Sequence, residues 1–127
     1  MTLIEKYFAL KQIPFFSRID HEELLLVANV ALVRKYNSES PVLEKGADLN
    51  RLIVVVEGSI HPIHTPEKAR EVIGIEPLVM EEEIGVDLVA GKSGAVCLNI
   101  SKGHLFTIIN EFPSLLTEYL LESEPSE

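Results

Sequence analysis

The chain has 127 residues, 46% of them hydrophobic and 24% charged, which is the size and composition of one globular domain with a proper core. Its formal net charge of −9 disfavours nucleic acid and anionic membrane surfaces as partners, because both are themselves negatively charged. No apolar run approaches the roughly 20 residues that a membrane span needs. No signal peptide is visible, and the lone cysteine, Cys97, fits a reducing compartment, so we expect a cytoplasmic protein without membrane insertion by this domain.

Helical patterns open the chain. Apolar residues at spacings of three and four predict a helix over Thr2–Lys11, which Pro14 interrupts because the residue before a proline disfavours helical geometry. Asp20 is a good N-cap, and Glu23 stands three residues later at the capping-box position. These residues predict a further helix that runs to about residue 30.

The segment Val42–Ser59 reads as two β-strands joined by a turn. Its second strand, Leu52–Val56, is five apolar residues in a row, which is typical of a strand buried on both faces or of one wall of a barrel. Gly46 and Gly58 stand where the chain must reverse, and glycine adopts positive φ at little steric cost. Further short strands, separated by turn signals, are predicted at Ile60–His64, Glu71–Ile75, Asp87–Ala90 and Ala95–Ile100.

The end of the chain is helical again. Ser101 is a plausible N-cap, and apolar residues follow at helical spacing. Pro113 either interrupts this pattern or starts a new, closing helix over Ser114–Leu121. The predicted organisation is a single α+β domain over residues 1–127: helices in 2–30, a β-roll in 31–100 and helices in 101–122.

This order resembles the cyclic-nucleotide-binding domain family. The resemblance rests on the leader Leu10–Phe16 (LKQIPFF), on the core hairpin Val42–Ser59, and on the last segment, Leu98–Leu121, with its strand, helix and proline. It covers nearly the whole chain. It implies an eight-stranded β jelly-roll barrel flanked by N-terminal and C-terminal helices.

The chemistry of that family lies in its phosphate-binding cassette, where a Gly-Glu pair opens a short helix and an Arg follows about ten residues later. The resemblance implies that the Glu takes the ribose hydroxyl and that the Arg pairs with the cyclic phosphate. Gly74 matches the glycine here. Ile75 stands at the Glu position, with Glu76 one residue late, and the Arg position falls at or near Ile84. No Arg or Lys lies between Glu71 and Gly91.

The missing cation has a large expected effect. A buried anion that loses its cationic partner is destabilised by roughly 3–5 kcal/mol, which is about two to four decades of affinity. Negative charge at Glu81, Glu82 and Glu83 adds to the penalty. We therefore expect a degenerate cassette that does not bind cyclic AMP or cyclic GMP tightly. The candidate ligand-binding residues are Gly74, Ile75, Glu76, Leu78, Val79, Ile84, Gly85 and Val86.

The sequence gives less support to a P-loop or to a metal site. Gly91-Lys92-Ser93 has the ending of a P-loop, but Val86 stands where the first glycine is required, so a turn with unusual φ at Gly91 and Gly94 is favoured. His61 and His64 would point to opposite faces of a strand, and the His-rich cluster of a cupin-type metal barrel is absent from the sequence. We expect no metal, no cofactor and no enzymatic activity.

The sequence thus predicts a non-catalytic regulatory or interaction module. Its partner would be a neighbouring domain or a second copy, contacted through the closing helix with Leu115, Leu116, Tyr119 and Leu120. The alternative is a sensor for a cyclic nucleotide or for another small ligand. In the latter case the barrel pocket would be apolar and lined by Ile73, Leu78, Val79, Ile84 and Val86.

Overall fold

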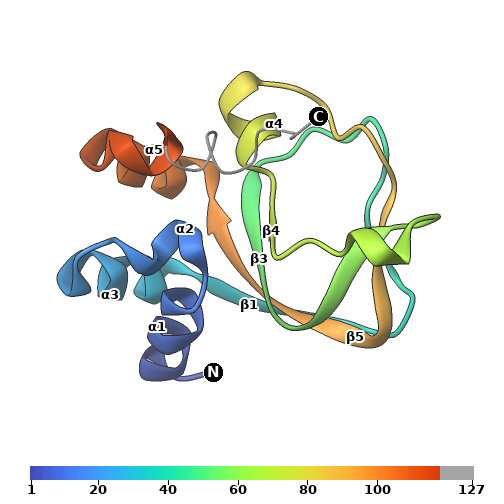
Figure 1. The fold of residues 1–127 in the computed structure, drawn as a ribbon, viewed down its shortest axis with the longest axis horizontal. Helices are drawn as coiled ribbons and strands as arrows, with labels where there is room; N and C mark the ends of the chain where they lie inside the picture. The colour runs from blue at the N-terminus through green and yellow to red at the C-terminus, as the bar shows by residue number, and fades with distance from the viewer. Residues whose placement is uncertain (118–127) are drawn as a thin grey trace. The chain divides into compact units, whose positions relative to one another are not determined.

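The computed structural model describes residues 1–117, and the chain falls into two compact units. One unit contains Met1–Val30 together with the chain from Gly103 onward, and the other contains Ala31–Lys102. The first unit is helical and the second is built around an antiparallel sheet (Figure 1). This is the α+β composition that the sequence predicts. No helix in the described part is long and apolar enough to cross a bilayer.

The helical unit contains α1 (Leu3–Lys11), α2 (Pro14–Ser17), α3 (His21–Val30) and α5 (Lys102–Glu111), whose first residue belongs to the other unit. Helix α1 begins at a capping box. The Glu5 amide donates to the Thr2 hydroxyl at 3.1 Å, and the Thr2 amide donates to the Glu5 carboxylate at 3.0 Å. The Glu5 interaction with Thr2 also lowers the pKa of that carboxyl group.

Helix α1 packs against α3 in this unit. Tyr7 and Leu10 form its buried face, and the Tyr7 hydroxyl forms a hydrogen bond with the His21 ring. The Phe15 and Phe16 rings on α2 meet edge to face, with centroids 5.0 Å apart. The helices predicted at Thr2–Lys11 and after Asp20 are therefore confirmed.

The sheet unit contains β1 (Leu32–Tyr36), β2 (Pro41–Leu43), β3 (Arg51–Pro62), β4 (Val72–Ile73) and β5 (Leu88–Ser101). The strand order is β1-β5-β3-β4, and β2 also pairs with β5. Every pairing is antiparallel. The long strands β3 and β5 run side by side and bend together in the ribbon (Figure 1).

The described residues form five strands where the resemblance implies eight. Two pairs of predicted strands are each continuous: Leu52–Val56 and Ile60–His64 share β3, and Asp87–Ala90 and Ala95–Ile100 share β5. The strands bend at irregularities instead of ending, because the β3–β5 register shifts between Val55 and Glu57 and again between Gly58 and Ile60. The strand predicted at Glu71–Ile75 shortens to β4, since Ile75 already begins helix α4 (Ile75–Met80).

Glycines allow the two long strands to approach closely at the bend. A Cβ added to Gly58 would lie 2.1 Å from the carbonyl oxygen of Gly94, and both residues have positive φ. Gly46 also has a positive φ, as predicted. The prediction for Gly91 was wrong: its φ is not in the left-handed region, and the residue is instead packed against Ser59, whose Oγ would lie 2.1 Å from an added Cβ.

Candidate functional site

The segment that corresponds to the cassette runs from β4 through Gly74 and α4 to residue 87 (Figure 1). Helix α4 has only six residues, from Ile75 to Met80, and Gly74 is its N-cap. It ends at Glu81, which adopts the left-handed conformation with a φ of 55°. The short helix after a glycine is the arrangement that the resemblance implies for this part of the chain.

Gly74 is required by the local geometry. Its φ is +112°, and an added Cβ would lie 2.4 Å from Leu49 Cδ2 and 3.4 Å from the Arg51 carbonyl oxygen. The backbone conformation therefore favours glycine, and any side chain here would also require Leu49 to shift. The match of Gly74 to the glycine of the cassette has a clear structural reason.

Ile75 and Ile84, which the resemblance aligns at or near the Glu and Arg positions of the family, have buried hydrocarbon side chains. Ile75 is 1% exposed and Ile84 is 4% exposed, and Leu78 on the same helix is also 1% exposed. An aliphatic side chain cannot donate to a phosphate or accept from a ribose hydroxyl. Glu76, which follows Ile75, is exposed.

The remaining candidate residues have mixed environments. Val79 and Val86 are half-buried, whereas Gly85 is exposed and has open space where a side chain would stand. The common burial of Ile75, Leu78 and Ile84 makes them core residues of the sheet unit. That the eight candidates together surround one ligand stays a prediction.

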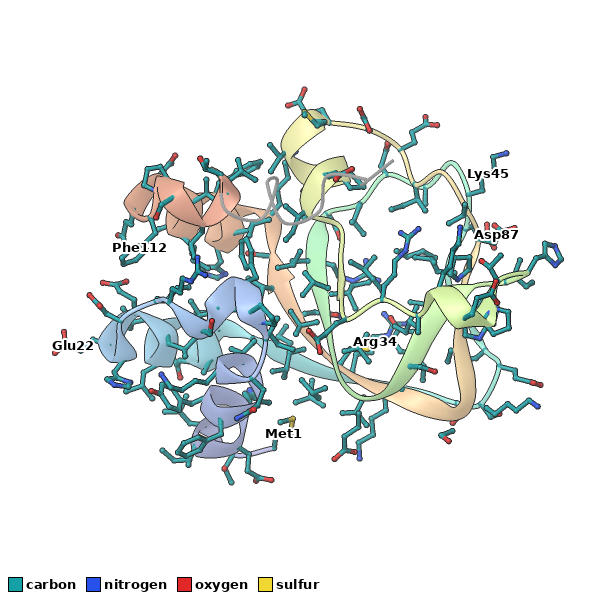
Figure 2. All side chains as sticks on the ribbon, viewed as in Figure 1. Met1, Glu22, Arg34, Lys45, Asp87 and Phe112 are labelled. Carbon is teal, nitrogen blue, oxygen red and sulfur yellow. The ribbon has the colours of Figure 1, made fainter. Side chains whose placement is uncertain are left out.

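Backbone hydrogen bonds join the end of this segment to the turn at Gly46. The Gly46 amide donates to the Ile84 carbonyl at 2.7 Å, and the Ile84 amide donates to the Ala47 carbonyl at 3.1 Å. The Lys45 amide donates to the Asp87 carboxylate at 2.7 Å, and both residues are labelled in Figure 2. Ile84 is thus fixed by its backbone as well as by its burial.

The charge around α4 is negative. Glu76, Glu81, Glu82 and Glu83 are all exposed, and no basic residue lies between Glu71 and Gly91. A phosphate placed beside these carboxylates would be repelled, and nothing in the segment itself would compensate it. The electrostatics of this segment disfavour an anionic ligand.

Cys97 is a buried free cysteine on β5. Burial raises the pKa of its thiol to about 11, although Arg34 and Arg51 act in the opposite direction, so the thiolate is scarce at neutral pH. Among residues 1–117, no three His, Cys, Asp or Glu side chains are grouped so that they could hold a metal ion.

The predicted contact stripe on the closing helix is only partly described. Residues 113–117 are helical, Leu115 is buried and Leu116 is half-buried. Tyr119 and Leu120 lie outside the described residues. The use of this stripe as an interface stays a prediction.

Comparison with solved structures reveals relatives of the fold. The regulatory subunit of a cAMP-independent protein kinase A from Trypanosoma brucei superposes with a TM-score of 0.74 at 19% identity, over 94% of this chain and 47% of that one. The regulatory domain of Toxoplasma gondii protein kinase A with cAMP gives 0.66 at 17% identity, over 84% and 44%. A candidate cyclic-nucleotide-binding protein from Geobacter metallireducens gives 0.66 at 14% identity, over 85% and 84%.

The chain has the fold of a cyclic-nucleotide-binding domain. At these identities the likeness concerns the fold, and the chain spans about half the length of the two kinase regulatory chains. No family model matches the sequence, and no curated protein matches it.

The predicted resemblance is therefore confirmed at the level of the fold. One related structure is described as containing cAMP and another as cAMP-independent. The fold therefore occurs in proteins with cAMP and in proteins described as independent of it. The ligand must be argued from the residues of this chain.

One group of polar residues was missed by the sequence analysis. Arg34, Tyr36, Arg51 and Asn99 lie on β1, β3 and β5, outside the cassette. The visible signal was the alternation of Arg34 and Tyr36, which places both on one face of a strand, but the partners that complete the group are distant in sequence.

Proposed function

We propose that the chain is a non-catalytic regulatory module that uses the cyclic-nucleotide-binding fold without binding cyclic AMP or cyclic GMP tightly. The observation that carries this proposal is the burial of Ile75 and Ile84 at the positions of the ribose-binding Glu and the phosphate-binding Arg. The absence of any basic residue between Glu71 and Gly91 supports it. The finer architecture of an eight-stranded jelly roll belongs to this proposal as well. If the bent strands β3 and β5 are each counted as two, the described residues supply seven of those strands.

The energetic argument concerns the anion. In the family arrangement one guanidinium neutralises the negative charge of the cyclic phosphate. Loss of that guanidinium weakens the free energy of binding by roughly 3–5 kcal/mol. A buried isoleucine at that position adds the cost of removing the phosphate from water without a new partner. The exposed carboxylates of Glu81, Glu82 and Glu83 raise that cost further.

A regulatory module needs a partner, and the stripe that begins with Leu115 and Leu116 is our candidate for the contact. A neighbouring domain or a second copy of the chain would provide the apolar surface. The solved relatives that are kinase regulatory chains are about twice as long as the matched region, which is compatible with a module that functions beside other domains.

The proposal is tested by unfolding the full chain in denaturant with and without 1 mM cyclic AMP. A ligand with a Kd of about 10 μM would raise the free energy of unfolding by about 2.7 kcal/mol at that concentration. We expect no change beyond about 0.5 kcal/mol for cyclic AMP or for cyclic GMP, well below that value. A rise of about 2.7 kcal/mol or more would contradict the degenerate cassette, since it needs a Kd of about 10 μM or tighter.

A further inference from the structure

Polar side chains gather on one face of the sheet formed by β1, β5 and β3. Arg34 lies opposite Cys97 and Tyr36 opposite Ala95 in the β1–β5 pair. In the β3–β5 pair, Ile53 lies opposite Asn99, and Arg51 lies opposite Ser101. Because alternate residues of a strand share a face, these positions all lie on the same side of the sheet. We call Arg34, Tyr36, Arg51 and Asn99 the polar face.

Three buried atoms of the polar face lack a hydrogen-bond partner among the described residues: Tyr36 Oη, Arg51 Nε and Asn99 Oδ1. Tyr36 is only 9% exposed, so its hydroxyl is not compensated by bulk solvent. Native proteins satisfy nearly all buried polar groups, so these three groups on one face of the sheet are available to hydrogen bond with a polar ligand. The two donors and one acceptor also define what chemistry that partner needs.

The same face carries two positive charges that no carboxylate neutralises in the described part of the chain. The recorded contacts are the Tyr36 ring, 4.9 Å below the Arg34 guanidinium, and the Asn50 side chain, 3.4 Å from Arg51 Nη1. Both guanidinium groups lower the pKa of the Cys97 thiol, so their fields meet at that residue. Arg34 is exposed and Arg51 is partly exposed, which leaves the charges within reach of a solute (Figure 2 labels Arg34).

We propose that the polar face binds a small molecule that carries a compact dianion, with a phosphate monoester as the ligand class. Arg34 and Arg51 would bind the anionic oxygens, the Tyr36 hydroxyl would donate to them, and Asn99 Oδ1 would accept from a hydroxyl or amine of the ligand. Two guanidinium groups match a dianion better than a cyclic phosphodiester, which has a single negative charge. The inference rests on the proposed function, because it takes the cations from strands β1 and β3 and not from the cassette segment, which has none.

The test is calorimetric titration of the full chain with 5′-AMP and, separately, with inorganic phosphate. We expect saturable binding of at least one of the two probes. Equal affinities would indicate that the anion alone is recognised, and tighter binding of 5′-AMP would indicate an added contact such as Asn99; both results support the site. The absence of saturable binding of either probe up to about 10 mM would overturn it.

Single substitutions test whether the phosphate probes bind at the polar face. Arg34→Gln and Arg51→Gln should each weaken the affinity about tenfold or more, because each removes a charge-assisted contact. Tyr36→Phe should weaken it severalfold and leave the fold intact, since it deletes only a hydroxyl without a partner. Lys35→Gln is the matched control: Lys35 is an exposed cation next to Arg34, on the opposite face of β1, so its loss should change the affinity by less than about twofold. Binding that is indifferent to both arginine substitutions would contradict the assignment.

Cyclic AMP serves as a parallel titrant that separates the two proposals. Tight binding of cyclic AMP that survives Arg34→Gln and Arg51→Gln would contradict the proposed function, whereas failure of both phosphate probes would contradict only the polar-face site. Tight binding of cyclic AMP that both substitutions abolish would overturn the proposed function and support the polar face as an anion site.

Discussion

Gly74 is the residue whose substitution most sharply tests the local structure of the cassette. Its φ of +112° and the 2.4 Å approach of Leu49 Cδ2 to an added Cβ leave no room for a side chain. We expect Gly74→Ala to lower the free energy of unfolding by about 2 kcal/mol or more, because strain in the left-handed region alone costs about 1–2 kcal/mol. Chemical denaturation measures this change.

Gly85→Ala provides the control for that substitution. Gly85 lies in the same segment, has no atom within 4 Å of an added Cβ and does not have a positive φ. We expect its free energy of unfolding to stay within about 0.5 kcal/mol of the unsubstituted protein or to rise slightly. Equal destabilisation by both alanines would show that the geometry around Gly74 is not as described.

Glu23 makes the stability of the helical unit depend on pH. Desolvation raises the pKa of its carboxyl group, and a hydrogen bond and repulsion from Glu111 add to the shift. An acid whose folded-state pKa is raised disfavours the folded state when it ionises, so stability increases as the pH falls from neutral through that raised pKa. The effect ends near the ordinary value of 4.5, where the unfolded chain also takes up the proton.

Glu23→Gln should therefore raise the melting temperature at pH 7 and lose this advantage near pH 4. Thermal unfolding at a series of pH values measures the difference. Glu67→Gln, in the short 3-10 turn Pro66–Lys68, is a matched charge removal away from this pair and should not reproduce the pattern. A gain that is constant from pH 7 to pH 4 would contradict the role of Glu23 and Glu111.

At the scale of elements, helix α4 is held by its apolar side. Leu78 is 1% exposed, whereas Met80, two residues later on the same helix, is 58% exposed. Leu78→Ala should cost about 2–5 kcal/mol in the free energy of unfolding, because it removes buried methyl groups and leaves a cavity. Met80→Ala changes a similar volume on the solvent side and should cost less than about 0.5 kcal/mol. Similar losses for both would show that α4 is not docked through Leu78.

The elements also show where sequence patterns succeed. The capping residues and apolar spacing specify the N-terminal helices locally, and the helix after Ser101 follows the same rules. Strand boundaries were harder to predict. Gly58 and Gly94 have the composition of turns, yet they lie within the long strands β3 and β5, where the backbones approach too closely for any side chain. Sequence alone does not distinguish a glycine that ends a strand from one that permits two bent strands to meet.

The sequence alone predicts those features of the candidate site that depend on a single residue. Gly74 was matched through the family resemblance, and the structure supplies the reason for a glycine in its φ of +112°. The absence of Arg and Lys around Ile84 is visible in the sequence, and its effect on a ligand stays a prediction. The polar face was not predictable, since Arg34 faces Cys97 only through the strand register. Such long-range pairings are set by the complete sheet and leave no local pattern.

At the scale of the whole molecule, our proposal separates the fold from the ligand chemistry. The bent antiparallel sheet and the flanking helices are those of cyclic-nucleotide-binding domains, as the superposition on the Trypanosoma brucei regulatory subunit shows. The segment that corresponds to the cassette contains Gly74 followed by a short helix, and the proposal depends on the burial of Ile75 and Ile84 at the positions it assigns to ligand contacts. A net charge of −9 gives no general attraction that could replace a lost cation.

Isothermal titration calorimetry of the full chain with cyclic AMP and cyclic GMP tests this separation most directly. We predict either no measurable heat of binding or a Kd of roughly 1 mM or weaker for both nucleotides, because a phosphate without its guanidinium loses about two to four decades of affinity. A Kd clearly below 10 μM for either nucleotide would contradict the central claim that the fold has been kept without its cyclic-nucleotide site.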